Sequence, residues 1–198
     1  MNHEQVALVA LLRTRPGRLT WPQITEEVLA CGSAVAVWER YNPEQLIPSP
    51  TATAALSEAE SDLQRWEREQ LCFISVLDKE FPHRLLDIVE TPPFLFAQGA
   101  IHAEDHGVSV VGSRKASARG LEMASGISRF LVHRGLSVIS GLAAGIDTAA
   151  HTAALNAGGR TVAFLGTGCG ISYPPKNRDL QAAIADRGLV LSQFWPEK

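Results

Sequence analysis

Two adjacent cations follow a glycine at the end of an apolar run. Arg114 and Lys115 come directly after Gly112 and Ser113, which close the run Val108–Val111. Arginine can hold a phosphate through two parallel hydrogen bonds, and lysine adds a point charge. Because a protein core has no reason to hold two cations at the end of a strand, these residues predict a phosphate site.

A second glycine loop, Gly141–Gly145, offers backbone N–H groups to an anion with no Cβ in the way, and the helix after it adds its positive end. The loop lacks the GxGxxG spacing of dinucleotide sites and the Gly-Lys-Ser/Thr end of a P-loop. We therefore expect phosphate binding without nicotinamide or ATP chemistry, and we predict no cofactor.

Asp147 and His151 lie four residues apart on one helix face. They could form a general-base pair, or they could make structural hydrogen bonds. Asp147 could also orient Arg114, pair with it internally, or cap its own helix. No complete catalytic constellation results, so no catalytic residue is predicted.

The segment from Tyr173 to Arg178 combines an aromatic ring with Lys176 and Arg178. Ring stacking and neutralisation of the backbone are how proteins hold a single strand without reading its bases. This segment follows the third glycine loop, Gly166–Gly170, and indicates a nucleic-acid ligand.

Three runs that read as fully buried strands precede the glycine loops: Val108–Val111, Leu136–Ile139 and Thr161–Leu165. The first two loops lead into helical patterns, and this alternation predicts an extended Rossmann-like α/β fold, a parallel sheet with helices on both faces. Ligands bind such sheets outside the carboxyl ends of the strands, so we expect the site there.

Further elements are predicted around this core. One is a helix that is capped by Ser117 and runs through His133; its apolar face consists of Leu121, Ala124, Ile127, Leu131 and Val132. Two more helices are predicted at Ile146–Leu155 and Asn177–Ala185. Three more strands are predicted at Phe73–Leu77, Phe94–Ala97 and Leu189–Leu191.

The residue pattern of the N-terminal part predicts a separate helical domain over residues 1–43. Its helices are expected at 4–13, from a cap at Thr20 to Leu29, and at Ala34–Arg40. This bundle could serve as a lid or spacer, or it could contact DNA or protein.

Prolines and small polar residues make 44–56 a linker, and Ser57 to Glu60 reads as a capping box. The Rossmann-like domain would therefore occupy residues 57–198.

Composition narrows the class of protein. The 198 residues carry a net charge of −3, but residues 107–198 hold 10 Lys and Arg against 5 Asp and Glu. This asymmetry favours an anionic ligand for the second half, although uneven surface charge is an equally simple reading. Three distant cysteines lack zinc spacing and no apolar run could span a bilayer, so we expect a cytoplasmic protein with no metal and no membrane contact.

Three motifs resemble the bacterial DNA-processing protein family, DprA, also called Smf. They are Val110–Arg114 (VVGSR), Ser140–Asp147 (SGLAAGID) with His151, and Gly166–Gly168 (GTG) followed by Tyr173-Pro174 and Asn177. Their order and spacing match, and the resemblance covers roughly residues 70–192. The resemblance implies sequence-independent binding of single-stranded DNA, with Arg114 and Lys176 on phosphates. It also implies loading of the RecA recombinase in natural transformation and a homodimer.

The residues predicted to bind nucleic acid or phosphate are Gly112, Ser113, Arg114, Lys115, Gly141, Gly145, Asp147, His151, Gly166, Thr167, Gly168, Tyr173, Lys176, Asn177 and Arg178.

Two alternatives stay open. The family's domain continues past the strand at Leu189–Leu191, so this chain is either a fragment or a shortened member, and its domain is expected to be incomplete. The rival function is a nucleotide-binding enzyme of the phosphoribohydrolase type, which shares glycine loops of this kind. Such enzymes use an acidic residue beside a Gly-Gly-x-Gly-Thr loop, and Gly166–Gly168 has no such partner.

Overall fold

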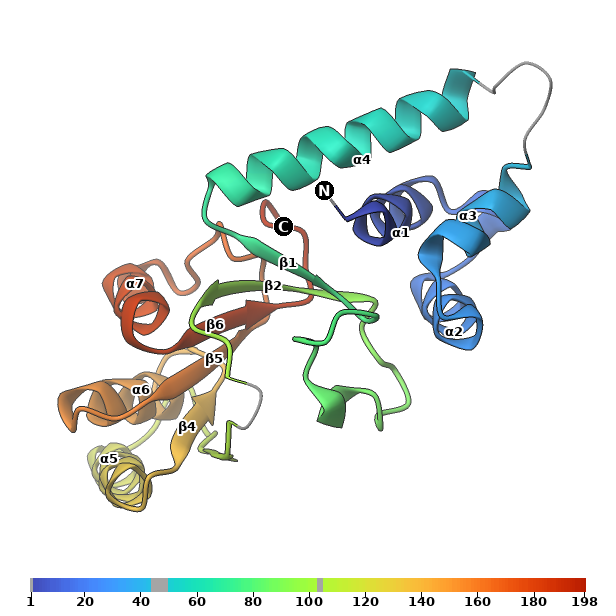
Figure 1. Ribbon diagram of the computed structural model, residues 1–198. Coiled ribbons are helices and arrows are strands. Elements are labelled where there is room, and N and C mark those ends of the chain that lie inside the picture. The colour runs from blue at the N-terminus through green and yellow to red at the C-terminus, as the bar shows by residue number, and fades with distance from the viewer. Residues whose placement is uncertain (1, 44–49, 103–104) are drawn as a thin grey trace. The chain divides into compact units, whose positions relative to one another are not determined.

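The computed structural model describes residues 2–43, 50–102 and 105–198, and the chain divides into two compact units, Met1–Leu95 and Phe96–Lys198 (Figure 1). Six strands form one sheet in the order β1-β2-β6-β5-β4-β3. Strands β3, β4, β5 and β6 pair in parallel with one another, and β2 pairs antiparallel with β6. The predicted Rossmann-like α/β fold is confirmed.

The first unit holds most of the helices. Its elements are α1 (His3–Thr14), α2 (Trp21–Cys31), α3 (Ala34–Tyr41), α4 (Pro50–Arg68) and β1 (Cys72–Ser75). The three predicted N-terminal helices are confirmed. Thr20 and Gln23 form a capping box at the start of α2, and Gly32 ends that helix in the left-handed conformation.

The linker prediction is wrong over residues 50–56, because α4 begins at Pro50 rather than at Ser57. Proline fits the first turn of a helix, where its missing N–H costs nothing, and the alanines that follow favour helix. Ser57 lies inside α4, where its carbonyl accepts a hydrogen bond from Ser61 Oγ at 2.9 Å. The rest of the predicted linker, residues 44–49, lies outside the described residues.

The second unit contains the predicted core with shifts of no more than two residues at any element end. Its elements are β2 (Phe94–Gly99), whose first two residues belong to the first unit, β3 (Gly107–Ser109), α5 (Ala118–His133), β4 (Ser137–Ser140), α6 (Ile146–Asn156), β5 (Thr161–Leu165), α7 (Arg178–Arg187) and β6 (Leu189–Ser192).

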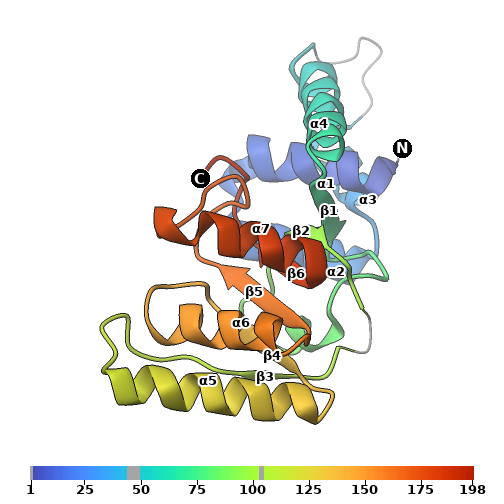
Figure 2. The ribbon, with the colours of Figure 1, turned by 90° about the vertical axis from the view of Figure 1, so that its left-hand side faces the viewer.

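Helices α5, α6 and α7 lie side by side on one face of this sheet rather than being divided between two (Figures 1 and 2). Strands β3, β4, β5 and β6 are neighbours in the order in which they follow along the chain. Because the crossovers between parallel strands are right-handed, each connecting helix then lies on the same face of the sheet. A buried apolar cluster holds α5 and α6 on β4, and its members are Val110, Ala124, Leu131, Val138, Ala150 and Ala154.

Two burial predictions fail at the end of the sheet. Strand β3 is the last in the strand order, and Val108 is 41% exposed rather than fully buried. On α5, Ile127 is 47% exposed because it lies on the side of the helix away from the cluster. β3 is an edge strand and α5 is the last helix of the layer, so both expose apolar side chains that the sequence pattern predicted to be buried.

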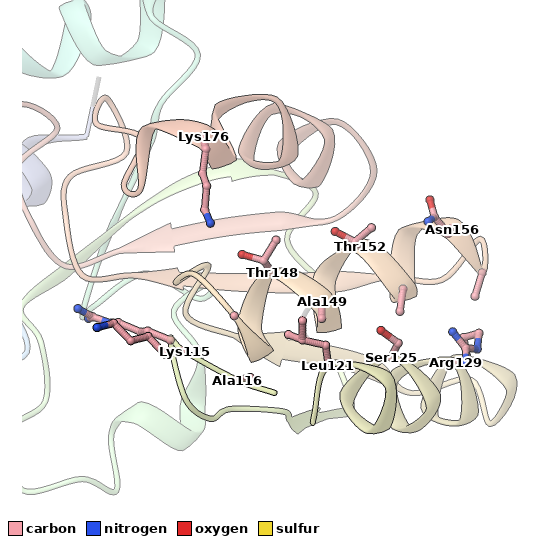
Figure 3. A pocket seen from close by; sticks show the side chains of 14 residues that line it. Lys115, Ala116, Leu121, Ser125, Arg129, Thr148, Ala149, Thr152, Asn156 and Lys176 are labelled. Carbon is pink, nitrogen blue, oxygen red and sulfur yellow. The ribbon is translucent and has the colours of Figure 1, made fainter. Parts of the chain in front are cut away.

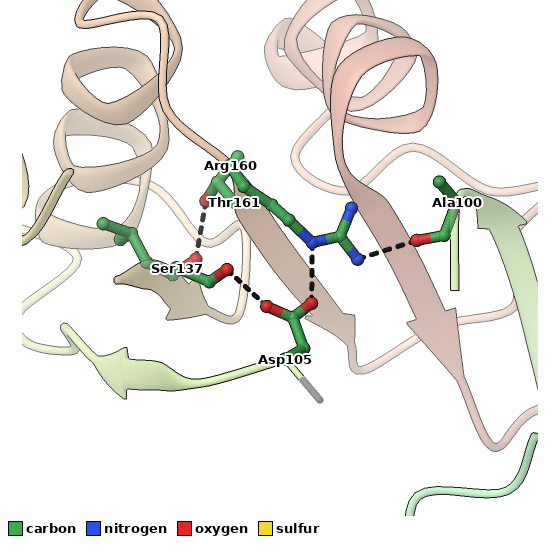
Figure 4. A network of polar contacts seen from close by, with 6 residues as sticks. Ala100, Asp105, Ser137, Arg160 and Thr161 are labelled. Atoms are coloured by element: carbon green, nitrogen blue, oxygen red, sulfur yellow. Dashed lines mark hydrogen bonds and ion pairs between the residues drawn. The ribbon is translucent and has the colours of Figure 1, made fainter. Parts of the chain in front are cut away.

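A polar network ties the segment before β3 to the starts of β4 and β5 (Figure 4). Arg160 Nε lies 2.7 Å from Asp105 Oδ2, and its Nη2 donates to the Ala100 carbonyl at 2.7 Å. The second carboxylate oxygen of Asp105 accepts from Ser137 Oγ. Less than a fifth of either charged side chain is exposed, so solvent screens the pair only partly.

Replacing Arg160 by alanine should lower the free energy of unfolding by about 2 kcal/mol, because it leaves the mostly buried Asp105 carboxylate and the Ala100 carbonyl without their donor. Urea unfolding followed by circular dichroism measures this. Asp105→Asn, which keeps acceptor capacity for Ser137, should lose less. An unchanged unfolding midpoint for Arg160→Ala would contradict a structural role for the network.

Candidate nucleic-acid interface

The glycine loops after β3 and β4 touch each other through Gly145. This residue has φ +85° and ψ −123°, and an added Cβ would clash with the Ser113 carbonyl oxygen and meet Arg114 backbone atoms at 2.9 Å. Ile146 N donates to the Ser113 carbonyl at 3.3 Å. The close approach therefore needs glycine, and it fixes where Arg114 leaves the sheet.

Buried polar side chains hold the loops in shape. Asp147 Oδ2 accepts from the N–H groups of Gly141 at 3.1 Å and Ala143 at 3.3 Å. Asn177 Nδ2 donates to the Leu142 carbonyl at 2.9 Å, which ties the third loop to the second. The carboxylate thus organises its own loop, and no described ion pair joins it to Arg114.

His151 is fully buried on α6. Its Nδ1 lies 2.7 Å from Thr161 Oγ1, which donates its own proton to the Val138 carbonyl at 2.7 Å. Nδ1 must therefore carry the hydrogen and donate it to Thr161. Burial lowers the pKa of His151 to about 4, against a smaller opposing effect of Asp147. The structural reading of this histidine is thus favoured over the general-base reading.

A groove opens at the same edge of the sheet and runs between α5 and α6 (Figure 3). Its volume is about 570 Å³. The residues that line it are Arg114, Lys115, Ala116, Leu121, Ser125, Arg129, Gly145, Thr148, Ala149, Thr152, Ala153, Asn156, Ala157 and Lys176. Four of the ten cations of residues 107–198 are in this set, and none of its members is acidic. The groove is therefore suited to an anion that carries several charges.

The groove brings together four of the predicted site residues, which are Arg114, Lys115, Gly145 and Lys176. Figure 3 shows Lys176 pointing toward the groove from the third loop, opposite Lys115. Tyr173 and Arg178 are exposed but do not line it. Gly112, Ser113, Gly141, Gly166 and Thr167 shape the loops without lining the groove.

Asp147, His151 and Asn177 lie behind the groove rather than at its surface. All three side chains are at least 94% buried and bonded to other parts of the protein. Motif residues of this kind position the binding groups from behind, so spacing alone could not separate them from the groups that face a ligand.

The third loop is packed against the end of the described chain. Gly168 N donates to the Lys198 carbonyl, and a Cβ at this glycine would clash with the Trp195 carbonyl oxygen. The close backbone packing at Gly168 therefore requires glycine. Burial raises the pKa of the neighbouring Cys169 thiol to about 12, which leaves it protonated and unreactive.

Sequence reasoning missed the helical walls of the groove. Leu121, Ser125 and Arg129 recur every four residues on α5 and so form one stripe. Thr148, Thr152 and Asn156 do the same on α6. The spacing was readable, but only the packing of α5 against α6 shows that these two stripes face each other.

The described residues contain neither a metal-binding cluster nor a membrane-spanning helix. Among residues 2–43, 50–102 and 105–198, no group of three His, Cys, Asp or Glu side chains could hold a metal ion. Within the same ranges no helix is long and apolar enough to cross a membrane.

Comparison with known proteins gives a consistent result. Residues 72–198 match the model of the family described as DNA recombination-mediator protein A. The chain is 39% identical to protein Smf of Synechocystis over 137 residues, which are 67% of this chain and 34% of that protein. It is 42% identical to the DNA processing protein DprA of Streptococcus pneumoniae over 62% of this chain and 43% of that one.

Solved structures agree with these matches. The crystal structure of the Streptococcus pneumoniae protein covers all of this chain with a TM-score of 0.64 at 32% identity, and 65% of its own length is matched. The Helicobacter pylori DNA processing protein A, studied for its single-stranded DNA binding mode, has the same fold, with a TM-score of 0.55 at 24% identity. It matches 65% of this chain and 57% of its own. The chain thus spans between a third and two thirds of the proteins it resembles.

Gly145→Ala should lower the free energy of unfolding by about 2 kcal/mol more than Gly158→Ala. Both glycines have positive φ, but a Cβ at Gly158 meets nothing within 4 Å, whereas one at Gly145 meets two backbone carbonyls. Chemical denaturation of both variants gives the difference. Equal losses would show that the contact between the loops carries no energy.

Lowering the pH should destabilise the fold through His151. Its pKa is about 4 in the folded protein and about 6.5 unfolded, so its contribution is complete above pH 6.5 and is lost between pH 6.5 and 4. The full change corresponds to about 3 kcal/mol. Urea unfolding across this range should show a weaker pH dependence in His151→Leu than in the wild type. Parallel curves would contradict the lowered pKa.

Proposed function

Because the chain belongs to the DNA recombination-mediator protein A family, we propose that it binds single-stranded DNA in the groove at the carboxyl edge of its sheet. The observation that carries this proposal is the convergence of Arg114, Lys115, Arg129 and Lys176 on one groove that no acidic residue lines. A ligand with a repeated negative charge, such as a DNA backbone, satisfies all four cations at once.

The binding would depend on phosphates rather than on base edges. Arg114 can hold a phosphate bidentately, and Lys176 approaches from the opposite side of the groove (Figure 3). Helices α5 and α6 begin beside the loops, so their N-terminal dipoles add to the positive potential. The 59% exposed ring of Tyr173, three residues before Lys176, is available for stacking on a base. Such contacts support binding without sequence preference.

A binding role without catalysis is the simplest reading of the site. The buried carboxylate of Asp147 accepts two backbone N–H groups, and the groove offers no other acid among its lining residues. The His151 side chain is fully buried and does not reach the groove. No observation therefore favours the phosphoribohydrolase alternative, and release of free base from a nucleoside monophosphate would be needed to revive it.

The wider role follows from the family. We infer that strand binding serves recombination by loading RecA onto DNA taken up in natural transformation, and that the active form is a homodimer. The support for these inferences is the family membership, and the four cations of the groove are our candidates for the DNA-binding part of that role.

Fluorescence anisotropy with a labelled oligo-dT strand tests the proposal. Wild type should bind, with log affinity falling against log salt by about 0.7 for each phosphate contact. Arg114→Ala should bind at least about tenfold more weakly with a shallower salt slope.

The matched control is Arg68→Ala, which removes an exposed arginine of α4 that does not line the groove. It should bind like wild type. Equal loss in both variants would mean that general charge rather than the groove holds the strand, and absence of wild-type binding at low salt would remove the proposal.

A further inference from the structure

The groove extends well beyond the glycine loops. Its lining continues along α6 from Gly145 to Asn156, and a rise of 1.5 Å per residue makes this length about 16 Å. A single phosphate occupies only a fraction of that length. Figure 3 shows Lys115 at one end and Arg129 with Asn156 at the other. The shape therefore fits several linked nucleotides better than one.

Small side chains keep the groove between α5 and α6 open. Ala149, Ala153 and Ala157 lie along α6 within the groove, where larger side chains would fill it. Polar groups stand along both walls. Ser125, Thr152 and Asn156 make no side-chain hydrogen bond to another described residue, so their hydroxyl and amide groups are available to a ligand.

Arg129 supplies the charge at the far end. It is exposed on α5, and within the described ranges it makes no ion pair and no side-chain hydrogen bond. Helices α5 and α6 both begin near the loops, so their favourable N-terminal ends support an anion there, and this support fades along the groove. A phosphate at the far end needs a side-chain cation, and Arg129 is placed to provide it.

We propose that a bound single strand continues from the glycine loops along the groove between α5 and α6 and places a second backbone phosphate on Arg129. This inference rests on the proposed function and specifies the direction in which the bound strand leaves the glycine loops. Arg114 and Lys176 hold the strand at the loops, and Arg129 holds it about three helical turns away. Thr152 and Asn156 line the groove between these points and offer hydrogen bonds to the sugar–phosphate backbone.

Oligo-dT strands of increasing length test this path. The shortest strand that wild type binds should bind Arg129→Ala equally well, because it occupies the loops alone. Strands long enough to reach the far end should bind Arg129→Ala about five- to tenfold more weakly, with a salt slope lower by about one unit.

Arg134→Ala is the matched control, because Arg134 is exposed at the end of the same helix, stacks over Phe130, and does not line the groove. It should bind every strand like wild type. Thr152→Trp, which fills the groove without changing charge, should weaken binding of the long strands only. Thermal unfolding confirms that each variant is folded.

The outcomes separate the two proposals. If wild type binds and Arg129→Ala matches it at every length, the path along α5 and α6 is wrong while binding at the loops stands. Equal weakening by Arg129→Ala and Arg134→Ala also overturns the path, because it shows a diffuse charge effect. If wild type binds no strand of any length, both proposals fail.

Discussion

The contact of Gly145 with the backbone of Ser113 and Arg114 is the constraint on which the rest of the site depends. It joins the ends of two neighbouring strands so closely that only a residue without a Cβ fits. Arg114 is thereby fixed at the mouth of the groove, and α6 starts directly behind it. Asp147 and Asn177 then hold the second and third loops around this contact, which brings Lys176 to the opposite side.

Electrostatics and packing cooperate in the groove. Four cations line a groove that no carboxylate lines, and their like charges give it a positive potential suited to an anion. The small residues of α6 leave room for that anion, while Ala150 and Ala154 on its other side seal the helix onto the buried cluster. One helix thus serves the core with one face and the groove with the other.

The sequence predicted the elements that carry strong local signals. The strands before the glycine loops and the caps at Thr20 and Ser117 are where the residue patterns placed them. The start of α4 was missed because Pro50 is compatible both with a linker and with a first helical turn. The site was predicted only in part. Arg114 and Lys176 follow from their motifs. The four-residue spacing of Arg129 on α5 could be read from the sequence, but only the packing of α5 on α6 shows that this stripe lines the groove.

A crystal structure of the chain with a bound oligo-dT strand would test the central claim most directly. The account predicts phosphates within hydrogen-bond distance of Arg114 and Lys176, with the strand lying between α5 and α6 in the direction of Arg129. A strand seated on another face of the molecule, with the groove empty, would contradict it. The Gly145 contact would then be a feature of the fold alone.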